Sequence, residues 1–433
     1  MRTLGDLTHD ELAVLVREYL LAGQLMDRAG MPHLIGAYGR DEMAAIAIDE
    51  WMGASPIYTT RMQRLLGYEG TGVPTIFKGL QLDIGAPPEF MDFRLKVIDD
   101  DHGEFWLDHC GALMDVEPMG EDYVHAMCHT IEDPTFDATA VATNRRAQIR
   151  PIHRPPRAPA DRHPHCHWTV IIDGSHPEVA LPEPMTHIER AQLASLELAP
   201  LGAGATDAEL ADGWNAYDAP VDPDLQTEQF STAALRAMAD EICVQQHLLV
   251  MSFCFAIERR HGTEDAVRII EQQFVGIAGL TSERLRIALG LGSDPGLGPV
   301  RATLDEVVTV LELHPAFRPR EYIDIQIELA VRSDPVLSVT LRDCAALHEP
   351  GFDNWISRLA DGHDGGLAAA SWGVTPFARV ERTRPRDGAV AEWTVWLGDE
   401  PTPEPTEVAL TRFSTGAAFQ FAATPVTLAA RRR

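Results

Sequence analysis

Near the start of the chain, apolar side chains recur at the spacing of one helical face. The positions that show this spacing are Leu12, Leu15, Val16, Tyr19 and Leu20. Intervals of three and four residues predict an amphipathic helix. A second helix is predicted over residues 41–66, with Pro56 as a possible bend.

The apolar period changes to two after residue 90. Phe93, Leu95 and Val97 alternate with polar positions, and the alternation resumes after an acidic turn over residues 99–103. This pattern predicts two antiparallel strands. A helix at 120–131 and a strand pair at 147–154 and 166–172 are expected to follow, with Pro151 placing the first of that pair at a sheet edge.

The same order of elements occurs twice. The stretch GRDEMAAIAIDEWMGASPIYTTRMQRLLG from Gly39 aligns without gaps with GTEDAVRIIEQQFVGIAGLTSERLRIALG from Gly262. MDFRLKVIDDDHGEFWLDHCGAL from Met91 likewise aligns with IQIELAVRSDPVLSVTLRDCAAL from Ile325, and CHWTV from Cys166 aligns with AEWTV from Ala391. Three matches in the same order indicate an internal duplication.

The sequence therefore predicts an α+β protein with two tandem copies of a helices-then-antiparallel-sheet domain, related by a pseudo-two-fold axis. The first copy is assigned to residues 1–175 and the second to 229–398. In the second copy, Ser231 is the expected N-cap of the first helix and Gly262 its expected stop. Residues 176–228, rich in Pro, Ala and acids, form a connector with a helix expected at 185–198. Residues 399–433 form a C-terminal extension in which further strands are expected.

Charge and composition limit the possible partners. The formal net charge is -29, which argues against binding to nucleic acid or to an anionic membrane surface. The longest apolar run is too short to span a bilayer, and the opening residues do not have the apolar core of a secretory signal. Six cysteines in 433 residues indicate reduced thiols rather than a disulfide framework. A cytoplasmic protein is expected, and a homo-oligomer is possible.

Cysteine and histidine concentrate in three patches of the first copy. Cys110 ends a strand, a helix carries His125, Cys128 and His129 on one face, and Cys166 lies in the run HPHCH. Thiolate and imidazole are common ligands of zinc and iron, so these five residues are the predicted ligands of a transition metal. The strand period predicts that Cys166 points inward with Trp168, and the flanking histidines outward. Inert core thiols are the alternative interpretation.

The second copy provides an internal control for this cluster. It keeps Cys344 opposite Cys110 but has Ala391 in place of Cys166, and no thiol near the expected match to Cys128. One copy is therefore predicted to retain a site that the other lacks. Arginines between residues 145 and 162, Arg150 and Arg154 among them, add a basic strip that could bind an anionic ligand. A surface strip that balances acids elsewhere is the alternative.

The motifs DHCGAL, MCHTIEDPTF and PHCHW, with Arg150 and Arg154 between the last two, resemble the C-terminal half of L-2-amino-thiazoline-4-carboxylic acid hydrolase-like proteins. That family is distantly similar to 4-vinyl reductase ligand-binding domains. The resemblance covers about residues 90–172 and implies roles for Cys110, Cys128, Asp133 and Cys166. The Pro-rich approach to Cys166 and the additional histidines depart from the family pattern.

Three hypotheses follow. The first is a hydrolase-like enzyme acting on a small carboxylated substrate, with Cys128 or Cys166 as nucleophile or metal ligand and Asp133 or a histidine moving protons. The second is a metal-containing protein that binds or senses a small molecule without catalysis. The third is a scaffold with inert thiols.

Overall fold

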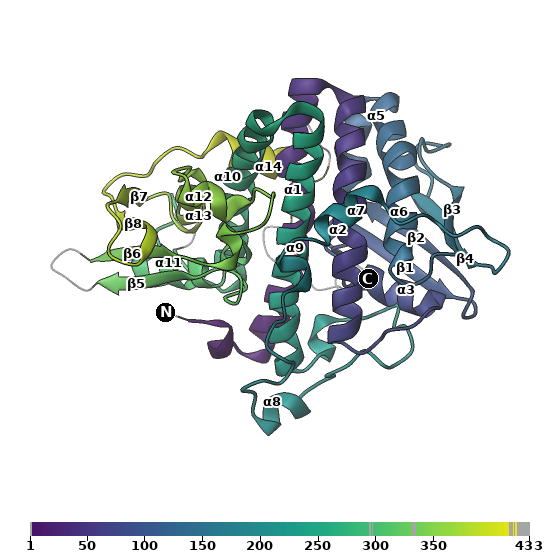
Figure 1. Cartoon of the computed structure of the whole chain (residues 1–433), viewed down its shortest axis with the longest axis horizontal. Coiled ribbons are helices and arrows are strands. Elements are labelled where there is room, and N and C mark those ends of the chain that lie inside the picture. Colours follow the sequence, from purple (N-terminus) through teal and green to yellow (C-terminus); the bar gives the residue numbers. More distant parts are fainter. Residues whose placement is uncertain are drawn as a thin grey trace.

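Two antiparallel sheets lie on opposite sides of a central group of long helices (Figure 1). The structure is a computed structural model that describes residues 2–293, 296, 298–330, 335–414, 419 and 421. It is an α+β protein with two sheet-containing parts, as the sequence predicts.

The first copy consists of helices followed by a four-stranded sheet. Its helical elements are α1 (His9–Tyr38), α2 (Arg40–Leu65), α3 (Val73–Gln81), α4 (Gly111–Val116), α5 (Glu121–His125), a π-helical turn (Ala126–Ile131) and α6 (Glu132–Val141). Its strands are β1 (Met91–Val97), β2 (His102–Cys110), β3 (Ala147–His153) and β4 (Cys166–Ile172). The connector holds α7 (Glu183–Ile188) and α8 (Asp207–Ala211).

The second copy repeats this order. Its helices are α9 (Thr232–His261), α10 (Thr263–Ala288), α11 (Leu304–Glu312), α12 (Trp355–Ala360) and α13 (Gly365–Val374), and α14 (Thr406–Phe413) follows the sheet. Its strands are β5 (Ile325–Ala330), β6 (Val336–Arg342), β7 (Ala378–Thr383) and β8 (Ala389–Leu397). Short 3-10 helices occur at Leu4–Asp6, Glu117–Met119, Leu193–Ser195, Thr227–Gln229, Pro315–Phe317 and Ala345–Leu347.

Local sequence sets the ends of the long helices. The Ser231 side chain accepts a hydrogen bond from the Ala234 amide at the start of α9, which confirms the predicted N-cap. Gly262 ends α9 with φ of +87°, and Gly39 ends α1 with the same value. Because side chains disfavour that conformation, glycine allows α1 and α9 to pass abruptly into α2 and α10.

The four long helices pack between the copies rather than only within them. Helix α2 lies against α9 and α1 lies against α10. Arg61 on α2 forms an ion pair with Glu241 on α9 at 2.5 Å, and Arg284 on α10 forms one with Glu18 on α1 at 2.6 Å. The two ion pairs occupy equivalent positions, because Arg61 aligns with Arg284 and Glu18 aligns with Glu241. In each pair the arginine comes from one copy and the glutamate from the other. This reciprocity is what a pseudo-two-fold axis through the bundle requires.

The two sheets have the same strand order. The first is β1-β2-β4-β3 and the second is β5-β6-β8-β7. Strand β3, which contains Pro151, lies at an edge as predicted. On the inner face, the buried Trp168 stacks on Phe105 and contacts Phe136 of α6 with ring centroids 5.0 Å apart. The helix therefore covers the side of the sheet on which Cys166 also lies.

Several local expectations were wrong or incomplete. The helix expected at 120–131 continues as α5, the π-helical turn and α6 to Val141. Of the connector helix expected at 185–198, only α7 and a 3-10 turn form. Helices α3 and α11 were not predicted, because short apolar segments do not distinguish helix from strand. In the C-terminal extension (399–433), where strands were expected, the described residues contain helix α14, and most of the residues after 414 lie outside the described ones. No described helix is both long and apolar enough to cross a bilayer.

Candidate functional site

The three predicted cysteines share one neighbourhood in the first copy. Cys110 ends β2, Cys128 lies in the π-helical turn and Cys166 begins β4. The amide of His165, just before Cys166, donates a hydrogen bond to the Leu107 carbonyl of β2. Cys110 and Cys166 each raise the pKa of Cys128, and Cys110 also raises the pKa of Cys166. All three are buried, with 2–4% of their surface exposed. Cys166 points inward as predicted, but His165 is also buried, contrary to the outward direction expected for it.

Burial determines the protonation state of these thiols. It raises the pKa of Cys110 to about 12 and those of Cys128 and Cys166 well above the usual value, with Glu132 as a further cause. These shifts favour the protonated thiols near neutral pH, whereas a cysteine nucleophile reacts as the thiolate. Cys110 has a structural contact, because its sulfur accepts a hydrogen bond from the Leu113 amide at the start of α4.

The predicted metal ligands are not arranged as a metal site. His125 is exposed and stacks on His129, whose Nε2 lies 2.7 Å from the Pro155 carbonyl. Over the described parts of the chain, no group of three or more His, Cys, Asp or Glu residues is placed to hold a metal ion. The zinc or iron hypothesis therefore has no geometric support.

The predicted anion-binding arginines already have partners. Arg150 donates to both carboxylate oxygens of Asp137 at 2.9 Å. Arg154 donates to Asp133, so the residue expected to move protons is held in an ion pair. These contacts favour the alternative that the basic strip balances acids of the same fold.

The second copy shows what the Arg154 contact does. Arg154 lies over the Trp168 ring, 5.7 Å from its centroid. The second copy has a similar contact from a different strand position, where Arg382 pairs with Asp364 and lies 4.9 Å from the centroid of Trp393. An arginine that links an acid to the central tryptophan of each sheet is a repeated structural feature. It therefore does not mark a catalytic group in one copy.

A pocket lies beside the cysteines, between α1 and the π-helical turn. It comprises two neighbouring cavities of about 110 and 90 Å³. The residues that line both are Gln24, Asp27, Ala112, Met127 and Ile131. Trp51, Phe93 and Phe136 add aromatic walls to the first cavity.

Asp27 is the central acid of this pocket. Its Oδ2 accepts a hydrogen bond from Trp51 Nε1 at 3.0 Å, whereas its buried Oδ1 has no partner among the described residues. Burial raises the pKa of Asp27 to about 7, and the tryptophan bond opposes this only in part. The fully buried Glu50 lies close by, with both carboxyl oxygens unpartnered in the described structure. Burial, and then the charge of Asp27, raise the pKa of Glu50 well above its usual range.

Two further acids line the first cavity. Asp83 accepts hydrogen bonds from the Tyr58 hydroxyl at 2.9 Å and the Gly85 amide at 2.7 Å, and burial raises its pKa to about 6. Glu132 follows the π-helical turn, and its Oε2 is buried without a partner in the described residues. Burial raises the pKa of Glu132 to about 8, although the Arg154 charge opposes it. Glu132 thus connects the cysteine cluster to the pocket.

The π-helical turn shapes this part of the pocket. Met127 and Ile131, near its two ends, line both cavities, and Glu132 comes directly after it. A π-helical turn widens the helix locally, and such turns are frequent at functional sites. The periodicity of an ordinary helix does not predict it, so the sequence did not indicate where these side chains would point.

The second copy lacks two of these four acids. The gap-free alignment of α1–α2 with α9–α10 places Val250 opposite Asp27 and Gln273 opposite Glu50. Trp355, which is fully buried, stacks on Phe274, the counterpart of Trp51, at 5.1 Å. The indole of Trp355 thus covers Phe274, whereas the aligned Trp51 of the first copy lines a cavity.

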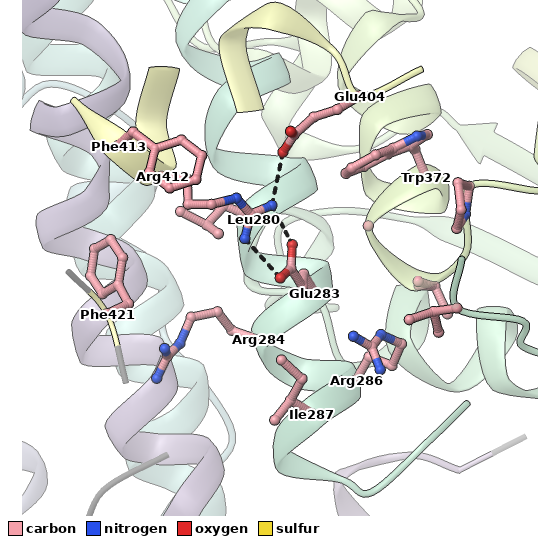
Figure 2. Close-up of a pocket in the computed structure, with 14 residues that line it drawn as sticks. Leu280, Glu283, Arg284, Arg286, Ile287, Trp372, Glu404, Arg412, Phe413 and Phe421 are labelled. Atoms are coloured by element: carbon pink, nitrogen blue, oxygen red, sulfur yellow. Dashed lines mark hydrogen bonds and ion pairs between the residues drawn. The ribbon is translucent and has the colours of Figure 1, made fainter. Parts of the chain in front are cut away.

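A separate cavity of about 580 Å³ lies in the second copy, beside α10 and α14 (Figure 2). Two of its arginines pair with acids, whereas Arg286 donates to the Leu291 carbonyl and its buried Nε has no partner among the described residues. Arg412 binds Glu283 at 2.5 Å and Glu404 at 2.9 Å, and Arg284 turns to Glu18 on α1. The first-copy pocket differs because Asp27, Asp83 and Glu132 in its lining form no ion pair within the described residues, and we place the candidate site there.

Comparison with known proteins gives no family. No protein-family model, no curated protein and no solved structure matches the chain. The resemblance to thiazoline-carboxylate hydrolase-like proteins remains a prediction.

Sequence reasoning missed Asp27, Glu50 and Asp83. A signal was available in the duplication, because the first two face neutral residues at aligned positions of the second copy. Their burial and the cavity beside them became apparent only in the folded chain.

Proposed function

We propose that the protein is a small-molecule enzyme whose acid–base site is the first-copy pocket. The observation that carries this proposal is the unpartnered Oδ1 of Asp27, a buried carboxyl oxygen in the wall shared by two cavities. Such an oxygen costs stability unless a bound molecule uses it. A largely apolar cavity with a few convergent polar groups is the usual form of a small-molecule site.

The chemistry follows from the protonation states. A group is most effective in proton transfer when its pKa lies near the working pH. Asp27, with a pKa of about 7, and Glu132, with a pKa of about 8, can each hold or release a proton near neutrality. In this proposal Asp27 takes a proton from the substrate and Glu132 supplies one. The carboxyls replace the thiolate as the reactive groups, and hydrolysis is one reaction that they could support.

The experiment is a turnover screen on the full chain. It covers thiazoline, cyclic amide and thioester substrates, each as a carboxylate and as an amine. For any substrate turned over, we expect Asp27→Asn and Glu132→Gln each to lower kcat by about 10²- to 10⁴-fold. The exposed Asp387 provides the matched control, and Asp387→Asn should retain wild-type activity.

The pH profile separates a catalytic carboxyl from a structural one. We expect an inflection of kcat near pH 7 in the wild type that disappears in Asp27→Asn. Full activity in a folded Asp27→Asn protein would remove this carboxyl from the mechanism. Loss of activity on alkylation of the cysteines in the folded protein would restore the thiol hypothesis.

A further inference from the structure

We propose that the ligand of the first-copy pocket is a small organic cation, with a protonated nitrogen carried on an apolar body about the size of one ring. This inference rests on the proposed function, since it names the ligand class of the same pocket. The ligand charge proposed here is positive, whereas the arginines between residues 145 and 162 predicted a negatively charged ligand.

The lining of the first cavity carries only one kind of charge. Among its described residues, Asp27, Asp83 and Glu132 are acids and none is basic. The second cavity adds Arg28, but this guanidinium binds Asp115 through two hydrogen bonds of 2.7 and 2.9 Å. An anionic ligand would meet buried carboxyls of like charge, whereas a cation would stabilise their ionised form.

Unused hydrogen-bonding groups also point to a ligand. Gln24 is 7% exposed and lines both cavities, and its carboxamide makes no hydrogen bond within the described structure. Asp27 Oδ1 and Glu132 Oε2 are unpartnered in the same part of the chain. These three residues offer acceptor oxygens around one space, and an ammonium group donates hydrogen bonds without needing to accept any.

The remaining walls suit an apolar body that carries such a charge. Trp51, Phe93 and Phe136 line the first cavity, and aromatic faces attract cations. An engineered apolar cavity of roughly 150 Å³ is known to hold benzene. Neither of the two adjoining cavities, of about 110 and 90 Å³, reaches that volume by itself, so in this proposal a single ring with a short substituent occupies both across the wall that they share.

The test compares benzylamine, benzyl alcohol and benzoate, three probes of similar shape and different charge, on the full chain at pH 7.5. Binding is measured by calorimetry. It is located by NMR of 13C-methyl methionine, because Met91 and Met127 line the first cavity. We expect benzylamine to bind at least about tenfold more tightly than benzyl alcohol, with benzoate weakest. Asp27→Asn should weaken benzylamine about tenfold and leave benzyl alcohol within about threefold, while Asp387→Asn changes neither.

The possible outcomes separate this inference from the proposed function. If benzyl alcohol binds as tightly as benzylamine and both shift the Met127 methyl signal, the pocket is a ligand site but the preference for cations is wrong. If no probe binds saturably, or binding leaves the Met91 and Met127 signals unchanged, both the preference and the site are overturned. Ala112→Leu, in the wall common to both cavities, should abolish binding in the folded protein.

Discussion

Replacing Asp27 with asparagine should change how the stability of the protein depends on pH. The folded chain raises the pKa of Asp27 from 3.8 to about 7. Between these values the native state keeps a proton that the unfolded chain has lost. The free energy of unfolding contributed by this residue therefore falls as pH rises from about 4 to 7, and stays low above pH 7.

The size of the effect follows from the two pKa values. Their separation corresponds to about 4 kcal/mol as an upper bound, at about 1.4 kcal/mol for each unit of pKa. Between pH 5 and pH 8 the contribution should change by about 2 to 3 kcal/mol. Asparagine is nearly isosteric and can still accept the hydrogen bond from Trp51, but it carries no charge. Asp27→Asn should therefore become more stable relative to wild type as pH rises.

The assay is urea unfolding at several pH values between 5 and 8.5, followed by tryptophan fluorescence and circular dichroism. The quantity of interest is the free energy of unfolding of Asp27→Asn minus that of wild type. Exposed Asp387 serves as the matched control, and Asp387→Asn should give a difference near zero at every pH. Glu132→Gln should show a similar change that extends to higher pH, because burial raises the pKa of Glu132 to about 8.

A pH-independent difference between Asp27→Asn and wild type would refute this reasoning. It would mean that Asp27 ionises in the native state as it does in the unfolded chain. The acid would then be solvated or paired, and the acid–base role proposed for it would lose its physical basis.

Three other changes test the two-copy architecture and the thiols. Arg284→Met should lower the free energy of unfolding by about 3–5 kcal/mol in chemical denaturation, because it leaves the buried carboxylate of Glu18 without its partner; a cost below about 1 kcal/mol would contradict this. Trp355→Ala should cost about 3–5 kcal/mol and open a cavity beside Phe274, and unchanged melting would show that the indole is not closely packed. In the native protein at pH 7.5, a thiol reagent should label half-buried Cys344 before the buried cysteines, as measured by peptide mapping. Earlier labelling of Cys110, Cys128 and Cys166 would contradict their raised pKa values.

Much of the fold could be predicted from the order of residues. The gap-free match of residues 39–67 to 262–290 was sufficient to predict two copies, because a duplicated pattern of apolar positions forms duplicated helices. The N-cap Ser231, the stop Gly262 and the edge strand with Pro151 were also predictable. Each depends on hydrogen bonds or backbone angles of a few neighbouring residues, which a sequence shows directly.

The candidate site could be predicted only in part. The sequence predicted that Cys110, Cys128 and Cys166 lie close together, and in the structure the three thiols are near enough to affect one another's pKa values. It could not show that the cluster is enclosed in the core, where the thiols remain protonated. The sequence also could not show that Arg154 forms an ion pair with Asp133. A cluster of arginines in a sequence does not indicate which of them are paired in the folded protein.

The sequence by itself determined the duplication, the α+β class and the concentration of reactive residue types in the first copy. The tertiary structure alone decided which of those residues are chemically available. Availability depends on burial and on partners far along the chain, and these set both the pKa of a group and whether its hydrogen bonds are satisfied. Asp27 is an ordinary acid in a helix when read in the sequence. It becomes a candidate proton carrier because folding surrounds it with Trp51, Glu50 and an apolar cavity, and no ion pair to it forms within the described residues.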